Sequence, residues 1–234
     1  NLHSQSASTL PQRLQDFLVA YAQPGVDPFT AGITYELPVP HDPVLAPAAE
    51  PLPALPRPQG TAVFRGDRLV GWLTPEESQG LALLAGESRS FLLTLPCPAA
   101  SGYLTVRVLR FDTRRTVVES ASFLEAASRG VAFRVEVRAE GSLNEQECRP
   151  ALDGARLRQL EEEASRTLEQ RMRRALTRLH RELRADPVGF GLELYHQRPR
   201  LWGEVASSWR ELLPHLPVYV HAAFALRRTG LATG

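Results

Sequence analysis

The side chains that could perform metal or acid–base chemistry are scattered along the chain and form no recognisable set. Six histidines are present, and no two of them share a spacing typical of metal ligands. They are His3, His41, His180, His196, His215 and His221. We place His180 on the polar side of a long helix, and His221 on the polar face of a strand. These positions predict structural or solvated histidines and no metal site.

The acidic residues and the nucleophiles likewise offer no catalytic pair. The acidic run at 161–163 lies on a helix, where a solvated charged face is its more common role. Asp186 ends that helix and Glu193 follows a turn, and neither has an obvious partner that would shift its pKa. Ser207 and Ser208 lack the strand–turn–helix context of a nucleophile elbow. We therefore expect no catalytic residues, no cofactor and no metal, in a protein that is not an enzyme.

The two cysteines, Cys97 and Cys148, are too few for a zinc site of their own. Neither is expected at a helix N-terminus, which would favour a reactive thiolate. A single disulfide is expected if the protein works outside the membrane, because such bonds persist in oxidising compartments. Two unpaired structural thiols are an equal alternative.

The charge balance excludes a strongly basic or acidic protein. All 27 basic residues are arginines, and 26 acidic residues reduce the formal net charge to +1. A chain so close to neutral has no overall field to attract nucleic acid, so we expect no nucleic-acid partner. The complete absence of lysine indicates mainly a compositional bias, and the hydrophobic fraction of 43% is ordinary for a globular protein.

Aromatic and arginine residues supply two hypotheses about binding. Trp202 and Trp209 are seven residues apart and share one helix face, where core packing is their more common role. The alternative is a ligand pocket lined by some of four residues, Trp72, Tyr195, Trp202 and Trp209. Arginines late in the long helix could contact anionic lipid or an acidic partner, and the alternative is a solvated face. The three chosen for this contact are Arg173, Arg181 and Arg184.

The segment 60–87, GTAVFRGDRLVGWLTPEESQGLALLAGE, predicts a strand–turn–strand–helix unit. Two short apolar runs flank the turn Arg65-Gly66-Asp67. Thr74 is a suitable N-cap, Pro75 suits the first helical position, and Glu77 completes a capping box.

The remainder predicts an antiparallel meander followed by helices. Apolar or alternating stretches at 91–95, 104–111, 116–120 and 131–138 predict four short strands, with a turn at Asp112-Thr113. Leucines spaced by three and four predict one long amphipathic helix over 153–185. Shorter helices at 188–196 and 199–213 follow, and alternation at 218–227 predicts a final strand, parallel or antiparallel to its neighbour. The fold class is therefore α+β: an antiparallel sheet with the long helix and the shorter helices on one face, and the last strand returning to the sheet.

The chain is expected to divide near Pro58, because a Pro/Ala-rich stretch at 40–58 resembles a linker. This gives a small N-terminal module at 1–58, part of a preceding domain, and an α+β domain at 59–234. A boundary near Ser88 is the alternative. The sequence begins at Asn1 and carries neither a signal region nor an apolar run long enough to span a bilayer, so we expect it to be soluble as given.

Three segments in register resemble the C-terminal domain of the Ger(x)C family, over about 60–231. They are the unit at 60–87, the stretch RADPVGFGLELYHQRPRLW at 184–202 with the charged helix before it, and SSWRELLPHLPVYVHAAFALRRTGL at 207–231. None of the three is catalytic, and their order and spacing together carry the resemblance.

The resemblance implies a C subunit of a receptor that senses nutrients and triggers the germination of bacterial spores. Proteins of that family are lipoproteins on the outer face of the spore inner membrane, and they work with integral-membrane A-type and B-type subunits. They have no catalytic residues to transfer to this chain. No lipidation cysteine lies near Asn1, which suggests a fragment without the membrane-proximal region that carries the lipid anchor.

Three functional hypotheses follow from these observations. The first is a non-enzymatic receptor subunit that contacts its partners through the exposed face of the long helix or through a free sheet edge. The second is a module that binds a small molecule, either a germinant or a wall fragment. An enzyme of the spore envelope is the weakest of the three, because the histidines and cysteines are scattered.

Overall fold

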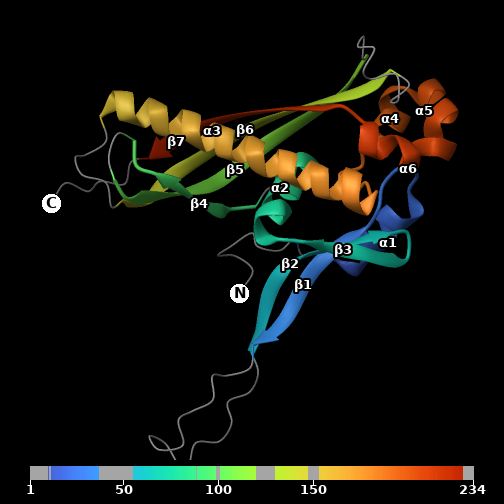
Figure 1. Cartoon of the computed structure of the whole chain (residues 1–234), viewed down its shortest axis with the longest axis horizontal. Helices are drawn as coiled ribbons and strands as arrows, with labels where there is room; N and C mark the ends of the chain where they lie inside the picture. Colours follow the sequence, from blue (N-terminus) through green and yellow to red (C-terminus); the bar gives the residue numbers. More distant parts are fainter. Residues whose placement is uncertain are drawn as a thin grey trace, which may run out of the picture.

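The computed structural model describes residues 10, 12–36, 55–87, 89–98, 101–119, 130–146 and 153–228. They form two β-sheets and a group of helices (Figure 1). The smaller sheet is antiparallel, with the strand order β1 (Phe29–Glu36), β2 (Leu55–Arg65) and β3 (Arg68–Leu73).

The predicted strand–turn–strand–helix unit is confirmed. Gly66 turns the chain between β2 and β3 with a φ of 64°. The backbone N–H of Thr74 donates to the Glu77 carboxylate at 2.8 Å, and the Glu77 N–H donates to the Thr74 hydroxyl at 3.2 Å. This capping box opens α2 (Pro75–Ala85), and Gly86 closes the helix in the left-handed conformation.

The larger sheet has four strands in the order β4 (Phe91–Pro96), β5 (Tyr103–Glu119), β6 (Val131–Gln146) and β7 (Val218–Arg228). The first two pairs are antiparallel, whereas β6 and β7 are parallel. The direction of the last strand, which the sequence left open, is thus parallel. A parallel neighbour needs a long crossover, and the helices between β6 and β7 supply it.

Two strands that were predicted as separate form a single strand, β5, in the structure. The stretch at 116–120 is not separate, because β5 runs straight through the predicted turn at Asp112 and Thr113. Asp112 pairs with Arg138 and Thr113 pairs with Val137, both on β6. The sixteen-residue partner strand therefore overrides the local turn preference of these two residues.

The long predicted helix is confirmed, and its last turns change character. The Asp153 carboxylate accepts from the backbone N–H groups of Ala155 and Arg156, at 3.0 Å and 2.9 Å, and this opens α3 (Gly154–Leu176). The helix continues directly as a π-helix, η3 (Thr177–Leu183).

The shorter helices gather at one end of the larger sheet (Figure 1). They are α4 (Phe190–Gln197), α5 (Pro199–Val205) and α6 (Trp209–Leu212), with 3₁₀ turns at η4 (Ala206–Ser208) and η5 (Leu213–His215). The single helix predicted at 199–213 is therefore broken into pieces. The ring of Phe190 on α4 packs against the ring of Phe133 on β6, with 4.7 Å between centroids.

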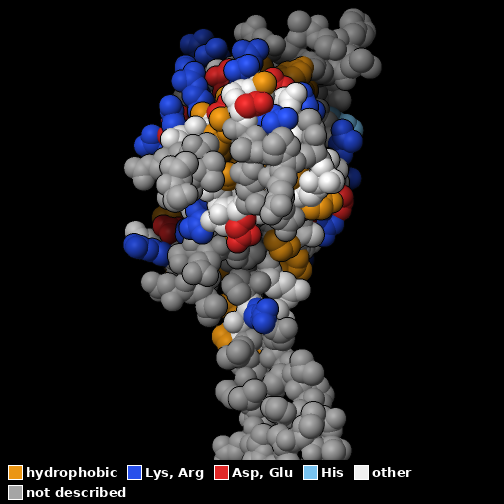
Figure 2. All heavy atoms as spheres, turned by 90° about the vertical axis from the view of Figure 1, so that its left-hand side faces the viewer, with side chains coloured by type: hydrophobic (Ala, Val, Ile, Leu, Met, Phe, Trp, Pro, Cys, Tyr) orange, Lys and Arg blue, Asp and Glu red, His pale blue; other side chains and the backbone are white. Residues whose placement is uncertain are grey.

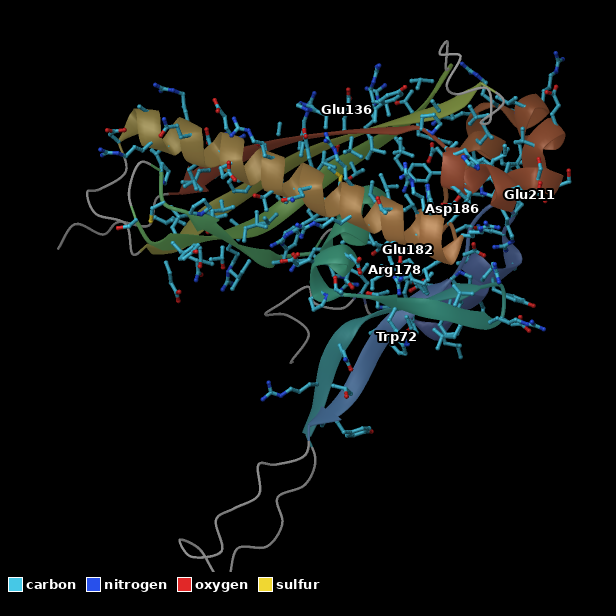
Figure 3. The ribbon with its side chains drawn as sticks, viewed as in Figure 1. Trp72, Glu136, Arg178, Glu182, Asp186 and Glu211 are labelled. Atoms are coloured by element: carbon cyan, nitrogen blue, oxygen red, sulfur yellow. The ribbon has the colours of Figure 1, made fainter. Side chains whose placement is uncertain are left out.

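The core lies between α3 and one face of the larger sheet. Leu160, Leu168 and Met172 of α3 are fully buried in the same apolar cluster as the inward residues of the sheet. The opposite face exposes charged side chains such as Arg138 and Glu136, and Figure 3 shows Glu136 on the side away from α3. Figure 2, a view from the end where α3 begins, shows arginine and acidic side chains intermixed on the surface. The fold is α+β, with the long helix on one face of the sheet as predicted.

The N-terminal segment is paired with the rest of the structure. The predicted boundary at Pro58 falls within β2, where Pro58 pairs with Ile33 of β1. Phe17, on α1 (Leu14–Ala22), packs edge-on against Phe64 of β2, with 5.1 Å between ring centroids. The division into 1–58 and 59–234 stays a prediction. The stretch at 40–54 and the alternative boundary at Ser88 lie outside the described residues.

Candidate functional site

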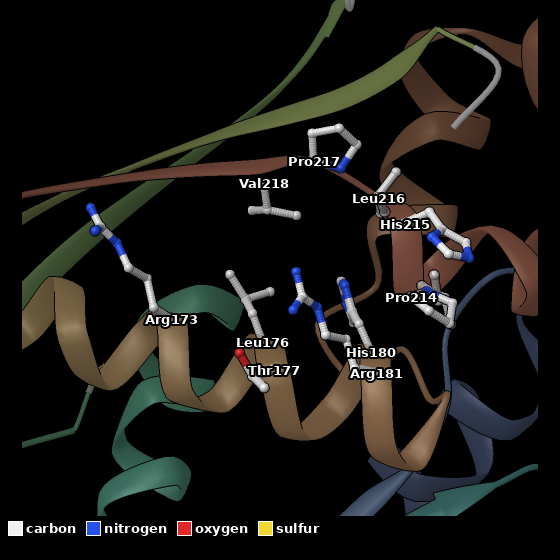
Figure 4. A pocket seen from close by; sticks show the side chains of 11 residues that line it. Arg173, Leu176, Thr177, His180, Arg181, Pro214, His215, Leu216, Pro217 and Val218 are labelled. Carbon is white, nitrogen blue, oxygen red and sulfur yellow. The ribbon is translucent and has the colours of Figure 1, made fainter. Parts of the chain in front are cut away.

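A groove of about 430 Å³ lies between the end of the long helix and the segment that leads into β7 (Figure 4). The helix contributes Arg173, Leu176, Thr177, His180 and Arg181 to its lining. The opposite wall consists of Leu213, Pro214, His215, Leu216, Pro217 and Val218. None of these residues is acidic, so the fixed charge of the lining is positive.

The wall opposite the helix follows from a short apolar and proline-rich sequence. Leu213 and Leu216 are buried and hold this segment against the core. The Leu216 N–H donates to the Leu213 carbonyl at 3.2 Å, which closes one 3₁₀ turn. Pro214 and Pro217 have no N–H to extend a helix or a sheet ladder, so the segment forms only the short 3₁₀ turn η5 before β7 begins.

His180 lies inside the protein, which corrects its prediction as a polar-side residue. Its side chain is 3% exposed, and its ring meets the Phe190 ring edge-on at 5.5 Å. The sequence placed it by the period of an α-helix. The π-helix closes i→i+5 hydrogen bonds and fits more residues into each turn, so its residues move around the axis from their α-helical positions.

The His180 imidazole is poorly satisfied where it lies. Its Nε2 atom is buried and has no hydrogen-bond partner among the described residues. Burial lowers the pKa of His180 to about 4, so the ring is neutral at physiological pH.

The structure brings together two of the three arginines proposed for partner or lipid contact. Arg173 and Arg181 both line the groove, and Arg173 also pairs with Glu169 at 3.1 Å. Arg184 is exposed at the end of the π-helix, outside the groove lining, with a φ of 49°. Within the part of the chain that the structure describes, no helix combines the length and apolar character needed to cross a bilayer.

Asp186 has partners on all sides, which corrects the prediction that it has none. Its Oδ1 accepts from the N–H groups of Gly189 and Phe190 at 2.9 Å and 3.1 Å. Its Oδ2 accepts from the Gly191 N–H at 2.8 Å and from the Trp209 Nε1–H at 3.2 Å. Burial raises the pKa of Asp186 to about 6, while the backbone donors at the start of α4 oppose that rise.

A second buried carboxylate, Asp27, ties the N-terminal segment to this corner. Arg210 binds it with two hydrogen bonds of 3.0 Å and 3.1 Å. The N–H of Asp186 donates to it at 2.9 Å, and the N–H of Gly66 donates at 3.3 Å. Asp27 thus joins the β2–β3 turn, the end of the long helix and α6, and its role is structural.

The four aromatic residues of the predicted ligand pocket do not converge. Trp202 and Trp209 contact each other, with 5.5 Å between ring centroids, and Trp209 is buried. Trp72 lies on β3 and is 49% exposed, beside a separate pocket that includes Ile33 (Figure 3). Tyr195 is exposed on α4 beside His196.

The outer edge of β7 is closed by side chains of α3. Three alternate backbone N–H groups of the strand donate to three side chains spaced one helical turn apart. The Ala222 N–H donates to Glu169 at 3.1 Å, the Phe224 N–H donates to Ser165 at 3.0 Å, and the Leu226 N–H donates to Glu161 at 2.8 Å. Strand addition is therefore blocked on this edge, and Glu161 has a structural role that the sequence did not predict.

The free edge of β5 is closed in a similar way near its end. The side-chain amide of Gln197 accepts from the Val117 N–H at 3.0 Å and donates to the Arg115 carbonyl at 3.3 Å. One amide group thus substitutes for a neighbouring strand.

The cysteine prediction is partly answered. Cys97 is disulfide-bonded, so the alternative in which both cysteines are unpaired thiols is excluded. Cys148 lies outside the described residues.

Comparison with known proteins identifies the family. The family model described as "Spore germination B3/ GerAC like, C-terminal" matches residues 59–230. The chain belongs to this family. The GerAC-like assignment confirms the Ger(x)C resemblance of the three segments, and it covers both walls of the groove.

One protein with a similar sequence agrees with the assignment, and one solved structure shares the fold. "Spore germination protein KC" of Bacillus subtilis (strain 168) is 25% identical over 182 residues, which cover 74% of this chain and 41% of that protein. The structure titled "Crystal Structure of the GerBC protein" matches with a TM-score of 0.73 at 18% identity, over 94% of this chain and 62% of that one. The chain therefore spans less than two thirds of either relative, and the second match shows the shared fold.

Sequence reasoning missed the groove because its two walls are distant in the chain. His180 directly follows Leu179 of the apolar stripe, but the period of an α-helix places it on the polar side, so it gave no signal. A signal was present instead in the repeat Leu-Pro-His-Leu-Pro at 213–217, which cannot continue either a helix or a strand.

Proposed function

We propose that this chain acts in spore germination as the C-terminal portion of a non-enzymatic C subunit of a nutrient germinant receptor. Its membership of the GerAC-like family is the observation that carries the proposal, and its similarity to spore germination protein KC of Bacillus subtilis supports it. In the longer protein this portion stands on the outer face of the spore inner membrane, held there by a lipid anchor. It contacts the integral-membrane A-type and B-type subunits.

The cationic end of the long helix is the proposed contact surface. Arg173, Arg181 and Arg184 all expose their side chains there, and an acidic partner or anionic lipid would complement them. The outer edge of β7 is a poor alternative, because α3 already occupies its N–H groups. Contacts through side chains of the helix are therefore favoured over strand addition.

A non-enzymatic role agrees with the position of Asp186, whose pKa burial raises to about 6. Asp186 is 1% exposed and both of its oxygens accept hydrogen bonds from inside the protein, so a substrate does not reach this carboxylate.

Affinity capture tests the proposed contacts. The chain is incubated with each detergent-solubilised partner subunit and, separately, with liposomes that contain anionic lipid. Selective capture of a subunit is expected, and reversal of all three arginines to glutamate should abolish it. A matched control reverses Arg158, Arg166 and Arg200, which are exposed and lie outside the groove. Equal loss in both triple variants would show a general charge effect, and capture that survives in the Arg173/Arg181/Arg184 variant would rule out this surface.

A second candidate function, binding of a small germinant or wall fragment, is favoured by the groove of about 430 Å³. That volume lies within the range of small-molecule sites. The site would be the groove and not the predicted aromatic set, because Trp72 lies apart from Trp202 and Trp209. Direct titration, described next, separates this function from partner contact.

A further inference from the structure

The groove presents a positive charge that nothing in its lining offsets. Eleven residues line it, and they include two arginines and two histidines but no aspartate or glutamate. Partly apolar walls lower the local dielectric and strengthen an ionic contact made inside the groove. A ligand that enters therefore gains by carrying negative charge.

Of the two arginines that line the groove, Arg181 is the one with no partner among the described residues. On the same helix, Arg178 pairs with Glu182, and Arg173 pairs with Glu169. The acids nearest to Arg181 in sequence are Glu182, which pairs with Arg178, and Asp186, which accepts hydrogen bonds from the start of α4. Arg181 makes no hydrogen bond or ion pair with the residues that the structure describes. A guanidinium in this state can bind a carboxylate or a phosphate with two parallel hydrogen bonds.

His180 supplies the second, independent feature. Its side chain is 97% buried, and Nε2 has no partner among the described residues. An unpaired buried polar atom destabilises the folded state, so native proteins rarely keep one without a reason. The ring belongs to the groove lining, and Figure 4 shows it extending from the helix toward the wall that carries Leu216. A ligand atom that hydrogen-bonds Nε2 would remove the cost.

The local backbone also favours a binding role. His180 and Arg181 both lie in the π-helix, a conformation that is rare and often found at functional sites. It turns His180 into the protein while Arg181 stays exposed at the groove. The two adjacent residues can therefore contact one ligand at two depths.

We propose that the groove binds one small organic anion that carries a carboxylate or a phosphate. The anionic group pairs with Arg181 and, secondarily, with Arg173, whose charge Glu169 already shares. A polar atom deeper in the ligand hydrogen-bonds Nε2 of His180. The ligand body lies against Leu176, Leu216 and Val218. The site shares Arg173 and Arg181 with the proposed partner surface, so the test below uses the chain alone, and the two proposals can fail independently.

The test is an NMR titration of the chain with sodium benzoate and with inorganic phosphate, at constant ionic strength. Benzoate combines a carboxylate with an apolar body, whereas phosphate tests the charge alone. Saturable shifts are expected at the His180 ring nitrogens and the Arg181 side chain, with tighter binding of benzoate. Arg181→Gln should weaken this binding about tenfold or more, because it removes a charged hydrogen-bond pair.

The matched control is Arg200→Gln, which removes an exposed arginine on α5 without touching the groove and should leave the dissociation constant unchanged. The proposal fails if neither anion gives saturable shifts in the groove, or if Arg181→Gln binds as the parent does. A glutamate-rich peptide is titrated in parallel. If it shifts the groove resonances while benzoate and phosphate do not, the occupant is an acidic protein segment and the small-anion proposal is overturned.

Discussion

Asp186 and His180 are buried polar residues six positions apart at the end of one helix, and they are satisfied very differently. The Asp186 carboxylate accepts four hydrogen bonds from α4 and Trp209. The His180 ring is equally buried, but its Nε2 atom has no partner among the described residues. Burial shifts both pKa values, and only Asp186 is compensated by its neighbours.

The difference separates a structural role from a binding role. A buried charge that is fully hydrogen-bonded fixes the geometry of the elements around it. A buried group with one unsatisfied atom destabilises the fold unless something outside the chain completes it. We therefore assign the Asp186 corner to architecture and the His180 groove to recognition.

The largest expected effect on stability is for a substitution of Asp186, the residue with a structural role. Asp186→Asn keeps the shape, but its amide N–H groups would face the donors of Gly191 and Trp209. We expect the free energy of unfolding to fall by roughly 3 kcal/mol, which urea denaturation would measure. Asp112→Asn, at an exposed position on β5, is the matched control and should change it by less than about 0.5 kcal/mol. Equal stability of the two variants would remove the distinction between the sites.

Lowering the pH should change the contributions of His180 and Asp186 to the stability of the fold in opposite directions. The unfolded His180 takes up a proton near pH 6.5, whereas the folded one does so near pH 4, so this residue destabilises the fold as the pH falls through that window. Asp186 behaves in reverse. Its folded pKa of about 6 exceeds the ordinary aspartate value of 3.8, so its contribution to stability grows as the pH falls from 6 to about 4.

Because the two contributions oppose each other, a variant is needed to separate them. His180→Leu removes only the histidine contribution. As the pH is lowered from 7 to 4, the free energy of unfolding of this variant should rise by about 3 kcal/mol relative to that of the parent. Paired urea denaturations of the two proteins would measure this difference. A constant difference across that range would mean that the folded imidazole titrates normally and is not sealed from water.

The smallest effect is expected for the same His180→Leu substitution at neutral pH. It removes the unsatisfied Nε2 while leaving an apolar side chain against Phe190, so stability should stay within about 1 kcal/mol of the parent or rise. Thermal unfolding at pH 7 would measure it. A loss of several kcal/mol would show that the imidazole is structural, like Asp186.

The sequence predicted well those features whose causes are local. The capping box of α2 lies within four residues, and the leucine spacing of α3 persists over many turns, so both were recognisable without a structure. Asp186 was missed because one of its four donors, Trp209, lies 23 positions away and meets it only in the folded chain. His180 was misplaced because the change from α-helix to π-helix after Leu176 leaves no signature in residue type.

The sheet edges and the groove were not predictable for a related reason. The contacts of Glu161, Ser165 and Glu169 with β7 join residues more than fifty positions apart. Nothing in the acidic run at 161–163 distinguishes the glutamate that bonds a strand from those that face solvent. Such pairings are set by the path of the crossover and not by local preference.

The parallel pairing of β7 with β6 determines when this fold can be completed. Val218 lies beside Phe133, so 85 positions of chain separate the two partners in sequence. During synthesis β5 and β6 can pair early, but the far side of β6 stays unoccupied until 218–228 has left the ribosome. Non-local parallel contacts of this kind form slowly, and an uncovered strand is a site of misassociation in the meantime. We therefore expect the slow step of folding to be the joint docking of α3 and β7, and any aggregation to begin at β6.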